Sequence, residues 1–252
     1  MITINNLYKK IGQKTLFNNI NLQLYSGQFT ALMGMSGAGK SSLLKIIAGA
    51  MEKDKGEIII DGRNIEQYSA IELAKKRAIL SPNITTNFPF KASKIVAMGR
   101  RPHIAGEVKE HDIQIITQSL AMAKAEHLAE RFYNSLSDGE KQKIQFAKVL
   151  AQLFEEKLEN YNNKYLLLDE PISALDIAQQ DLLLKLVRNL AENFNIGILA
   201  IMHDINLVAK YADQIILLKD GELIDSGTGE QVLTDKNLFS TFNAKIMLSK
   251  IN

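Results

Sequence analysis

Residues 34–41 have the types and the spacing of a loop that binds phosphate. The stretch Gly34-Met35-Ser36-Gly37-Ala38-Gly39-Lys40-Ser41 fits the pattern G-x-x-x-x-G-K-[ST]. An apolar run at 28–33 precedes it and favours a buried strand, and residues 42–48 favour a helix. Strand, turn and helix together direct free backbone amides and the positive end of the helix at one point, where an anion can bind. We therefore expect Lys40 to reach the outer phosphates of a nucleotide and Ser41 to help bind Mg²⁺.

Two carboxylates stand where the second half of such a site is needed. Asp169 ends the apolar run 165–169, a position from which it can bind the Mg²⁺ shared with Ser41. Glu170 is the next residue, and neighbouring side chains at a strand end point in different directions. Glu170 can therefore act as a base that orients and polarises the attacking water. The alternative, two solvated carboxylates before a proline turn, is disfavoured by the phosphate-binding pattern upstream.

A histidine ends the next apolar strand. His203 follows the run 196–202, so it is expected at the same sheet edge as both phosphate elements. A lone histidine is more often structural, but here it is placed to donate a hydrogen bond to the terminal phosphate. The other three histidines, at positions 103, 111 and 127, lack metal-ligand spacing, and we expect them at the surface.

Residues 136–142, Leu-Ser-Asp-Gly-Glu-Lys-Gln, precede and open another helix. Ser137 and Gly139 offer a hydroxyl and free amides to an anion at the helix start. Taken by itself, this segment is an ordinary N-cap.

Composition narrows the class of protein. The chain has 252 residues, enough for one large domain or a domain with a subdomain, and 46% of them are hydrophobic and 23% charged. The net charge of +2 gives no global basic field for nucleic acid. The absence of cysteine excludes disulfides and thiolate metal sites. We find no signal peptide and no apolar run long enough to span a bilayer, so any membrane connection must go through a partner.

Buried strands alternate with helices along the chain, which indicates a parallel α/β sheet. Strand patterns also occur at 2–7, 15–25 and 56–62, and Lys219-Asp220-Gly221 predicts a hairpin. From about 92 to 158 the apolar spacing is helical, and 155–164 is expected to be an exposed loop.

Together these residues resemble the nucleotide-binding subunit of ABC transporters along essentially the whole chain. Five elements carry the resemblance in the right order: Walker A (Gly34 to Ser41), the signature (Leu136 to Gln142), Walker B with its catalytic glutamate (Leu166 to Glu170), the D-loop (Ser173 to Asp176) and the switch histidine (His203). The family fold is an α/β P-loop NTPase with a mixed sheet, a small antiparallel β part and a helical subdomain. The resemblance implies a nucleotide-binding core at 1–86 and 159–252 and a helical subdomain at 87–158.

The resemblance also implies a composite site in a homodimer. ATP would be bound by one copy and closed over by Ser137 and Gly139 of the other, with Glu170 and His203 as catalytic residues and Ser41 and Asp169 as Mg²⁺ ligands. The remaining residues implied to bind the nucleotide are Gly34, Ser36, Gly37, Ala38, Gly39, Lys40 and Ser42.

Shorter motifs resemble the haemin importers of the iron-chelate and cobalamin group. They are residues 87–90, 98–103 and 173–180, together with the polar insertion before Asp169. This implies haem uptake across a bacterial inner membrane, from its cytoplasmic face. The implied partners are two permease subunits, contacted through about residues 82–103, and indirectly a periplasmic binding protein.

The chain departs from the family pattern at several positions. The Q-loop glutamine, expected near residue 82, is replaced by Pro82, and Asn83 is shorter and displaced. Asp138 replaces a signature glycine and should repel phosphate unless it points away. The adenine-stacking aromatic is expected near Ile11, where Tyr8 or an aliphatic side chain could take its place.

Other functions stay open from the sequence. The transported chelate could be another siderophore or cobalamin. Two further classes are a non-transport ABC-type ATPase of repair or translation and a non-hydrolysing nucleotide-binding module. The first usually has two cassettes or a long coiled coil, and Glu170 and His203 argue against the second.

Overall fold

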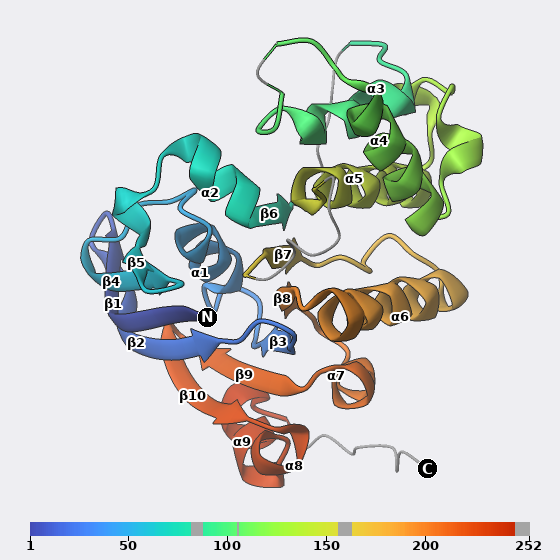
Figure 1. Cartoon of the computed structure of the whole chain (residues 1–252). Coiled ribbons are helices and arrows are strands. Elements are labelled where there is room, and N and C mark those ends of the chain that lie inside the picture. The colour runs from blue at the N-terminus through green and yellow to red at the C-terminus, as the bar shows by residue number, and fades with distance from the viewer. Residues whose placement is uncertain (82–87, 105, 156–162, 245–252) are drawn as a thin grey trace.

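A six-stranded sheet forms the centre of the molecule. The computed structural model describes residues 1–81, 88–104, 106–155 and 163–244 (Figure 1). The strands lie in the order β10-β9-β3-β8-β7-β6, parallel to one another except for the antiparallel pair of β9 and β10. Their bounds are β3 Phe29–Met33, β6 Arg77–Leu80, β7 Tyr165–Asp169, β8 Gly197–Ile201, β9 Gln214–Lys219 and β10 Glu222–Gly227. The predicted mixed α/β fold is therefore confirmed.

The central strands are apolar because both faces of the sheet are covered. All residues of β3, β7 and β8 are buried. Alternate residues enter different cores: Leu166 and Leu168 belong to one cluster, and Leu167 belongs to the other. A continuous apolar run, rather than an alternating one, is what a strand in this position needs.

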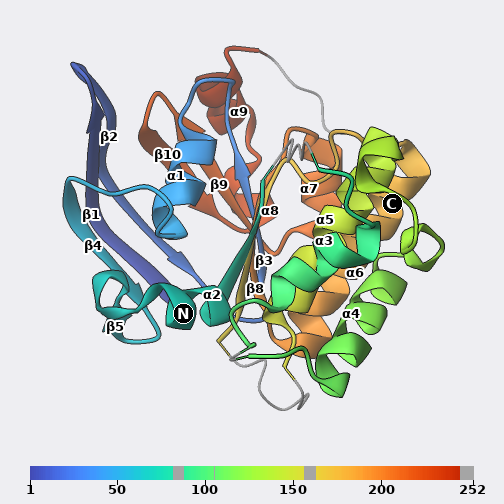
Figure 2. The same cartoon turned by 90° about the horizontal axis from the view of Figure 1, so that it is seen from above.

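A second, antiparallel sheet covers one face together with helix α1. It has the order β2-β1-β4-β5, with bounds β1 Ile2–Ile11, β2 Lys14–Leu24, β4 Lys55–Ile60 and β5 Arg63–Asn64. Helix α1, Lys40–Ile47, lies between this sheet and the central one (Figure 2). The strand predicted at 2–7 was too short, because shifts in register after Ile4 break its alternation while β1 continues to Ile11.

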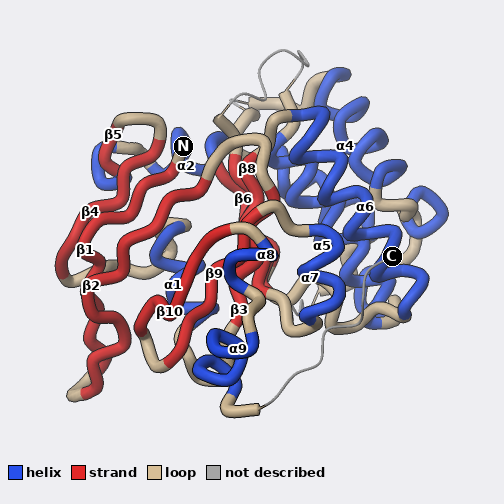
Figure 3. The backbone as a smooth tube through the Cα atoms, turned by 90° about the horizontal axis from the view of Figure 1, so that it is seen from below, coloured by secondary structure: helices blue, strands red, loops and turns tan. Residues whose placement is uncertain are grey.

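Helices cover the opposite face (Figure 3). Helices α3 Ala92–Ala97, α4 Glu110–Met122 and α5 Asp138–Leu153 pack together, and we call them the helical group. The other helices are α2 Ala70–Lys76, α6 Ile177–Phe194, α7 Ile205–Tyr211, α8 Gly229–Val232 and α9 Asp235–Phe242, and short 3-10 turns lie at Ile65–Gln67, Met98–Arg100, Glu126–Leu128 and Tyr133–Ser135. In the described chain, none of the helices has the length and apolar character that crossing a membrane requires.

The helical group contains a buried ion pair that its apolar spacing did not predict. Arg100 donates from Nε to Asp112 Oδ1 at 2.9 Å, and both side chains are almost fully buried. Its Nη1 donates to the carbonyls of Ala151 and Phe154 at 2.7 and 2.5 Å. Asp112 therefore faces inward on α4, whereas the neighbouring apolar residue Ile113 is exposed.

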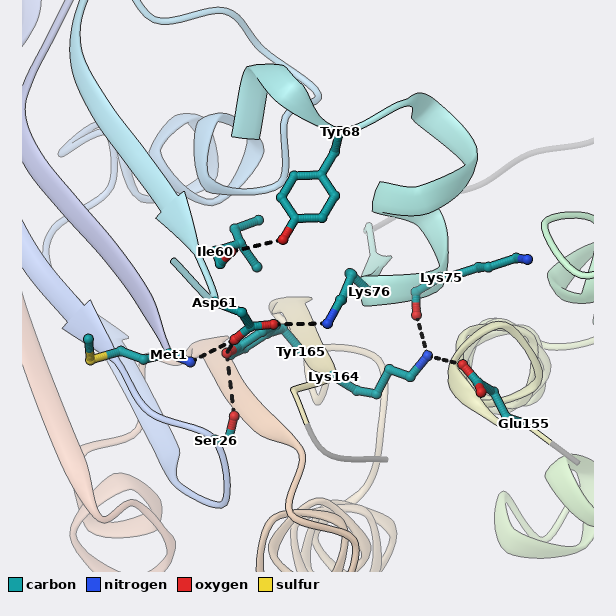
Figure 4. Close-up of polar contacts among 10 residues, drawn as sticks. All are labelled: Met1, Ser26, Ile60, Asp61, Tyr68, Lys75, Lys76, Glu155, Lys164 and Tyr165. Carbon is teal, nitrogen blue, oxygen red and sulfur yellow. Dashed lines mark hydrogen bonds and ion pairs between the residues drawn. The ribbon is translucent and has the colours of Figure 1, made fainter. Parts of the chain in front are cut away.

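Polar contacts join α5 to the core at the amino-terminal edge of the sheet. Lys164 was expected in an exposed loop but is buried, because its ammonium donates to the Lys75 carbonyl at 2.7 Å and contacts Glu155 (Figure 4). His103 was expected at the surface but is half-buried, with Nε2 2.8 Å from the Gln152 carbonyl. Burial lowers the pKa of His103, and the Gln152 carbonyl opposes that shift.

A partly buried carboxylate joins the two sheets beside this contact. Asp61 accepts from the Tyr165 hydroxyl at 2.8 Å, from Lys76 Nζ at 3.0 Å and from the Met1 amino group at 2.9 Å (Figure 4). Burial raises the pKa of Tyr165 well above its ordinary value, and the contact with Asp61 adds to the shift.

Candidate nucleotide-binding site

The phosphate-binding loop connects β3 to α1, as its pattern predicts. Helix α1 begins at Lys40, two residues earlier than predicted, and Gly39 is its N-cap with φ 101°. This conformation favours glycine. A Cβ on Gly39 would also lie 2.8 Å from Phe17 Cε1, so a side chain would collide with β2. Met35, Ser36 and Gly37 are exposed, which leaves this part of the loop open to a ligand.

Two neighbouring segments hold the loop in shape. Within the loop, the Ala38 amide donates to the Met35 carbonyl at 3.2 Å. From the turn between β9 and β10, the Gly221 amide donates to the Ala38 carbonyl at 3.3 Å. A Cβ on Gly221 would lie 1.8 Å from the Leu16 carbonyl, so only glycine lets this turn approach β2. The loop is therefore held by a hydrogen bond of its own and by one from the turn between β9 and β10.

Lys40 folds back onto its own loop. Its Nζ donates to the carbonyls of Gly34 and Met35 at 2.8 and 2.9 Å, and the residue is buried. Burial lowers the pKa of Lys40, and the charges of Glu170 and Asp169 oppose the shift. The ammonium is thus bonded to the loop carbonyls, and the charges of both carboxylates of the site act on its pKa.

Asp169 meets Ser41 across the gap between β7 and α1. The Ser41 hydroxyl donates to Asp169 Oδ1 at 3.0 Å. Burial raises the pKa of Asp169 and nearby Glu170 adds to the shift, while the Ser41 hydrogen bond, Lys45 and Lys40 oppose it. The Asp169 carboxyl therefore lies in a place that disfavours its charged form, which is a common feature of functional sites.

These two oxygens fit a magnesium site. Mg²⁺ prefers oxygen ligands and is commonly held by one or two protein groups together with substrate phosphates and water. Asp169, at the end of β7, and Ser41, on the helix that also carries Lys40, supply one oxygen each. Among the described residues, no three histidine, aspartate or glutamate side chains gather into a larger metal site. The donor set thus suits a cation that arrives with the nucleotide.

Glu170 and His203 form a pair at the rim of the site. Glu170 Oε1 lies 2.9 Å from His203 Nε2, and the two side chains are 39% and 53% exposed. Strand β8 lies between β3 and β7, so the strand ends that carry His203, the phosphate-binding loop and Asp169 are adjacent. The structure therefore brings these sequence-predicted residues to one edge of the sheet.

The signature residues lie apart from the loop, at the start of α5. Ser137 is the N-cap and forms a reciprocal capping box with Glu140. Gly139 faces the 173–175 turn, where an added Cβ would lie 3.3 Å from the Ala174 carbonyl. Asp138 is exposed to solvent, with its side chain 88% exposed and its carboxylate 3.5 Å from Lys141 Nζ.

The remaining predictions concern residues around the loop. Ser42 lies in the first turn of α1. Tyr8 lines a surface hollow with Asn18 and Lys55 that contains no residue of 34–42, whereas Leu16 is near the loop, 3.4 Å from a Cβ placed on Gly39. Pro82 and Asn83, the departure from the Q-loop pattern, lie outside the described residues.

Sequence patterns missed three contacts within the site. The attachment of Lys40 to its own loop, the pairing of Glu170 with His203, and the contact of Gln142 with the turn after Glu170 all depend on tertiary distances. One signal was available for the third: Gln142 lies five residues after the predicted N-cap Ser137, on a helix already assigned to the site.

Comparisons with known proteins agree with this geometry. A family profile described as ABC transporter matches residues 17–173. The hemin import ATP-binding protein HmuV of Gloeobacter violaceus is 39% identical over 96% of this chain and 86% of its own length. The protein of the same name from Escherichia coli O157:H7 is 37% identical over 99% of this chain and 95% of its own length.

Solved structures are similar over the whole fold. A transporter classed as metal-chelate type ABC, in an inward-facing conformation, superposes with a TM-score of 0.80 and 30% identity, covering 97% of this chain and 89% of that one. A dimeric ATP-binding cassette in a post-hydrolysis state with ADP and Pi gives a TM-score of 0.77 at 27% identity, covering 91% and 99%. The family profile covers more than half of the chain, and the structural similarity extends over nearly all of it. This protein therefore belongs to the ABC transporter family, as an ATP-binding and ATP-hydrolysing subunit.

Proposed function

We propose that this chain is the ATPase subunit of an importer that takes up haem across a bacterial inner membrane. The observation that carries the proposal is its similarity to hemin import ATP-binding proteins, at 36–39% identity over 90–99% of the chain. The similarity to a metal-chelate type transporter agrees with this substrate class and leaves a second candidate, another iron chelate, siderophore or cobalamin.

Each residue of the site has a role in our proposal. The backbone amides of 34–39 and the start of α1 bind the phosphates, and Lys40 leaves the loop carbonyls for the outer phosphates. Ser41 and Asp169 would hold Mg²⁺, whose chemistry is to neutralise charge on the phosphate oxygens. Glu170 orients a water for in-line attack on the γ-phosphorus and accepts its proton. His203, now bonded to Glu170, donates a hydrogen bond to the terminal phosphate.

The site is completed by a second copy of the chain. Ser137 and Gly139 cap α5 outside their own phosphate-binding loop, so a partner's signature would form the opposite wall over the nucleotide. The division into a core at 1–86 and 159–252 and a helical subdomain at 87–158 follows the same scheme. Closure around ATP and reopening after hydrolysis would then move the helical part of each copy.

The surface near residues 82–103 would contact the two permease subunits. Its described part exposes apolar side chains: Phe88 is 68% exposed, and Phe90 and Met98 are exposed to a lesser degree. Phe88 and Phe90 lie together, with ring centroids 6.0 Å apart, and contiguous exposed apolar side chains commonly mark interaction sites. The protein would therefore bind at the cytoplasmic face of the membrane, with the periplasmic binding protein reached only through the permease and with no role for nucleic acid.

The catalytic part is tested by Glu170→Gln. Loss of the base should reduce phosphate release by about 10²–10⁴-fold. ATP binding, measured by calorimetry, should survive because the amide keeps the size of the side chain and a bond to His203. Full turnover in this variant would refute the assigned role.

The transport part needs the permease. Cells that express the whole importer should accumulate haem with the wild-type subunit and not with the Glu170→Gln variant. Ferric siderophore and cobalamin serve as competing substrates in the same assay. Uptake of either one in place of haem would refute the haem assignment and leave the ATPase roles untouched, whereas recovery of ribosomes or DNA with the purified chain would favour a non-transport ATPase.

A further inference from the structure

Gln142 connects the helical group to the turn that follows Glu170. Its side-chain Nε2 donates to the Pro171 carbonyl and lies 3.5 Å from the Glu170 carbonyl. Gln142 is on α5, the helix whose first turn holds Ser137 and Gly139. One helix therefore carries both the residues proposed to cover a partner's nucleotide and a donor to the backbone beside the chain's own base.

The backbone at Glu170 needs such donors. Glu170 has φ 51°, a left-handed conformation that costs a non-glycine residue about 1–3 kcal/mol and persists only where its surroundings hold it. The Ser173 hydroxyl and amide donate to the Glu170 carbonyl at 3.1 and 3.4 Å. Gln180, on α6, donates to the carbonyls of Ile172 and Leu175 at 3.3 and 3.0 Å. Within the described part of the chain, Gln142 is the donor to this turn that comes from the helical group.

The far end of α5 is fixed to the core. Gln152 Nε2 donates to the carbonyls of Ala74 and Arg77 at 2.8 and 3.0 Å. Beyond the helix, Glu155 contacts Lys164, which donates to the last turn of α2 (Figure 4). Any rotation of α5 against the core will therefore be small at this end and large at the signature end.

The helix is long enough for a small rotation to matter at Gln142. Ten residues separate Gln142 from Gln152, or about 15 Å at 1.5 Å of rise per residue. A rotation of about 10° around Gln152 would then displace Gln142 by roughly 2.6 Å. A hydrogen bond does not survive a displacement of this size. The contact seen in this position of the helical group would thus be lost after such a rotation.

We propose that Gln142 is a positioning residue for ATP hydrolysis. Its hydrogen bond to the backbone at Glu170 and Pro171 sets the direction of the Glu170 carboxylate according to the position of α5. The inference rests on the proposed role of Glu170 as the base. Because Ser137 and Gly139 share the helix, closure over the nucleotide at one site is transmitted to the base at the other.

The test compares Gln142→Met with Gln180→Met in the purified full chain. Methionine keeps an unbranched side chain and good helix propensity but cannot donate a hydrogen bond. Gln142→Met should lower kcat about tenfold and leave the Kd for ATP within twofold and Tm within about 3 °C. Gln180→Met, which removes donors to later carbonyls of the same turn, should keep kcat within twofold. Gln142→Lys restores a donor of similar reach and should recover most of the lost kcat.

Three results would overturn the proposal. The first is a kcat within twofold of wild type in Gln142→Met, and the second is an equal loss in Gln180→Met. The third is a loss that appears in Kd or Tm, which would mark a structural role. Glu170→Gln, measured in parallel, tests the role of Glu170 separately from the role of Gln142. If this variant keeps full turnover, the role of Glu170 as the base fails. If it is inactive while Gln142→Met is normal, only the role of Gln142 fails.

Discussion

Replacing Asp169 by asparagine should stabilise the nucleotide-free protein while it removes activity. The side chain is only 5% exposed, and burial raises the pKa of its carboxyl, so the ionised form is held at a cost. Asparagine has nearly the same size, and its Oδ1 can still accept the hydrogen bond that the Ser41 hydroxyl now donates at 3.0 Å. The substitution therefore removes the buried charge and keeps the packing and the bond.

The expected gain in the free energy of unfolding is modest, because two lysines lose a nearby opposite charge. Lys45 and Lys40 both act to lower the Asp169 pKa, so their attraction offsets part of the burial cost. Substitutions that relieve a strained functional site typically raise the free energy of unfolding by about 0.5–2 kcal/mol. For a chain of this size, that corresponds to a rise in Tm of about 1–8 °C.

The gain should depend on pH with a defined sign. A carboxyl whose pKa is higher in the folded than in the unfolded state binds more protons when folded. The wild-type free energy of unfolding therefore falls as pH rises from the unfolded pKa, near 3.8, through the raised folded value. The advantage of Asp169→Asn should be full above that window and should shrink as pH falls through it.

Urea denaturation of wild type and Asp169→Asn between pH 4 and pH 8 measures this difference. Asp138→Asn is the matched control, since its carboxylate is exposed and its loss should change the free energy of unfolding by less than about 0.5 kcal/mol. Phosphate release in the presence of Mg²⁺ should be lost in Asp169→Asn alone. The reasoning would be refuted if Asp169→Asn were less stable than wild type at pH 7. It would also be refuted if the difference in the free energy of unfolding between the two proteins were the same at every pH.

Two further substitutions test other parts of the fold. Lys40→Ala removes the ammonium from the phosphate-binding loop, so calorimetry should show that ATP binding is weakened by tenfold or more. This is the loss expected when a charged hydrogen bond of about 1.5–3 kcal/mol is removed. An unchanged affinity would contradict the proposed movement of Lys40. Arg100→Met leaves Asp112 buried without its partner and should cost about 3–5 kcal/mol, a fall in Tm of about 6–20 °C. The double variant with Asp112→Leu should recover part of that loss, and an equal or larger loss would show that the ion pair is not the cause.

The positions of the phosphate-binding loop, Asp169 and His203 could be predicted because each follows a fully buried strand. Such strands are recognisable from an uninterrupted apolar run, and parallel strands bring their carboxyl ends to one edge. The same reasoning could not predict the length of β1, whose polar residues and shifts in register erase the alternation. It also missed the burial of Lys164, because the Lys75 carbonyl that holds it is far away in the sequence.

The contacts inside the site indicate what a nucleotide must replace when it binds. Lys40 is bonded to the carbonyls of Gly34 and Met35, and His203 is bonded to Glu170, so the groups proposed to meet the terminal phosphate already have partners in this structure. The phosphates would also arrive beside two carboxylates, Asp169 and Glu170, and like charges at short range repel. A cation held by Ser41 and Asp169 would offset that repulsion. Release of His203 would also leave Glu170 dependent on its backbone for direction, which is the place where Gln142 is bonded.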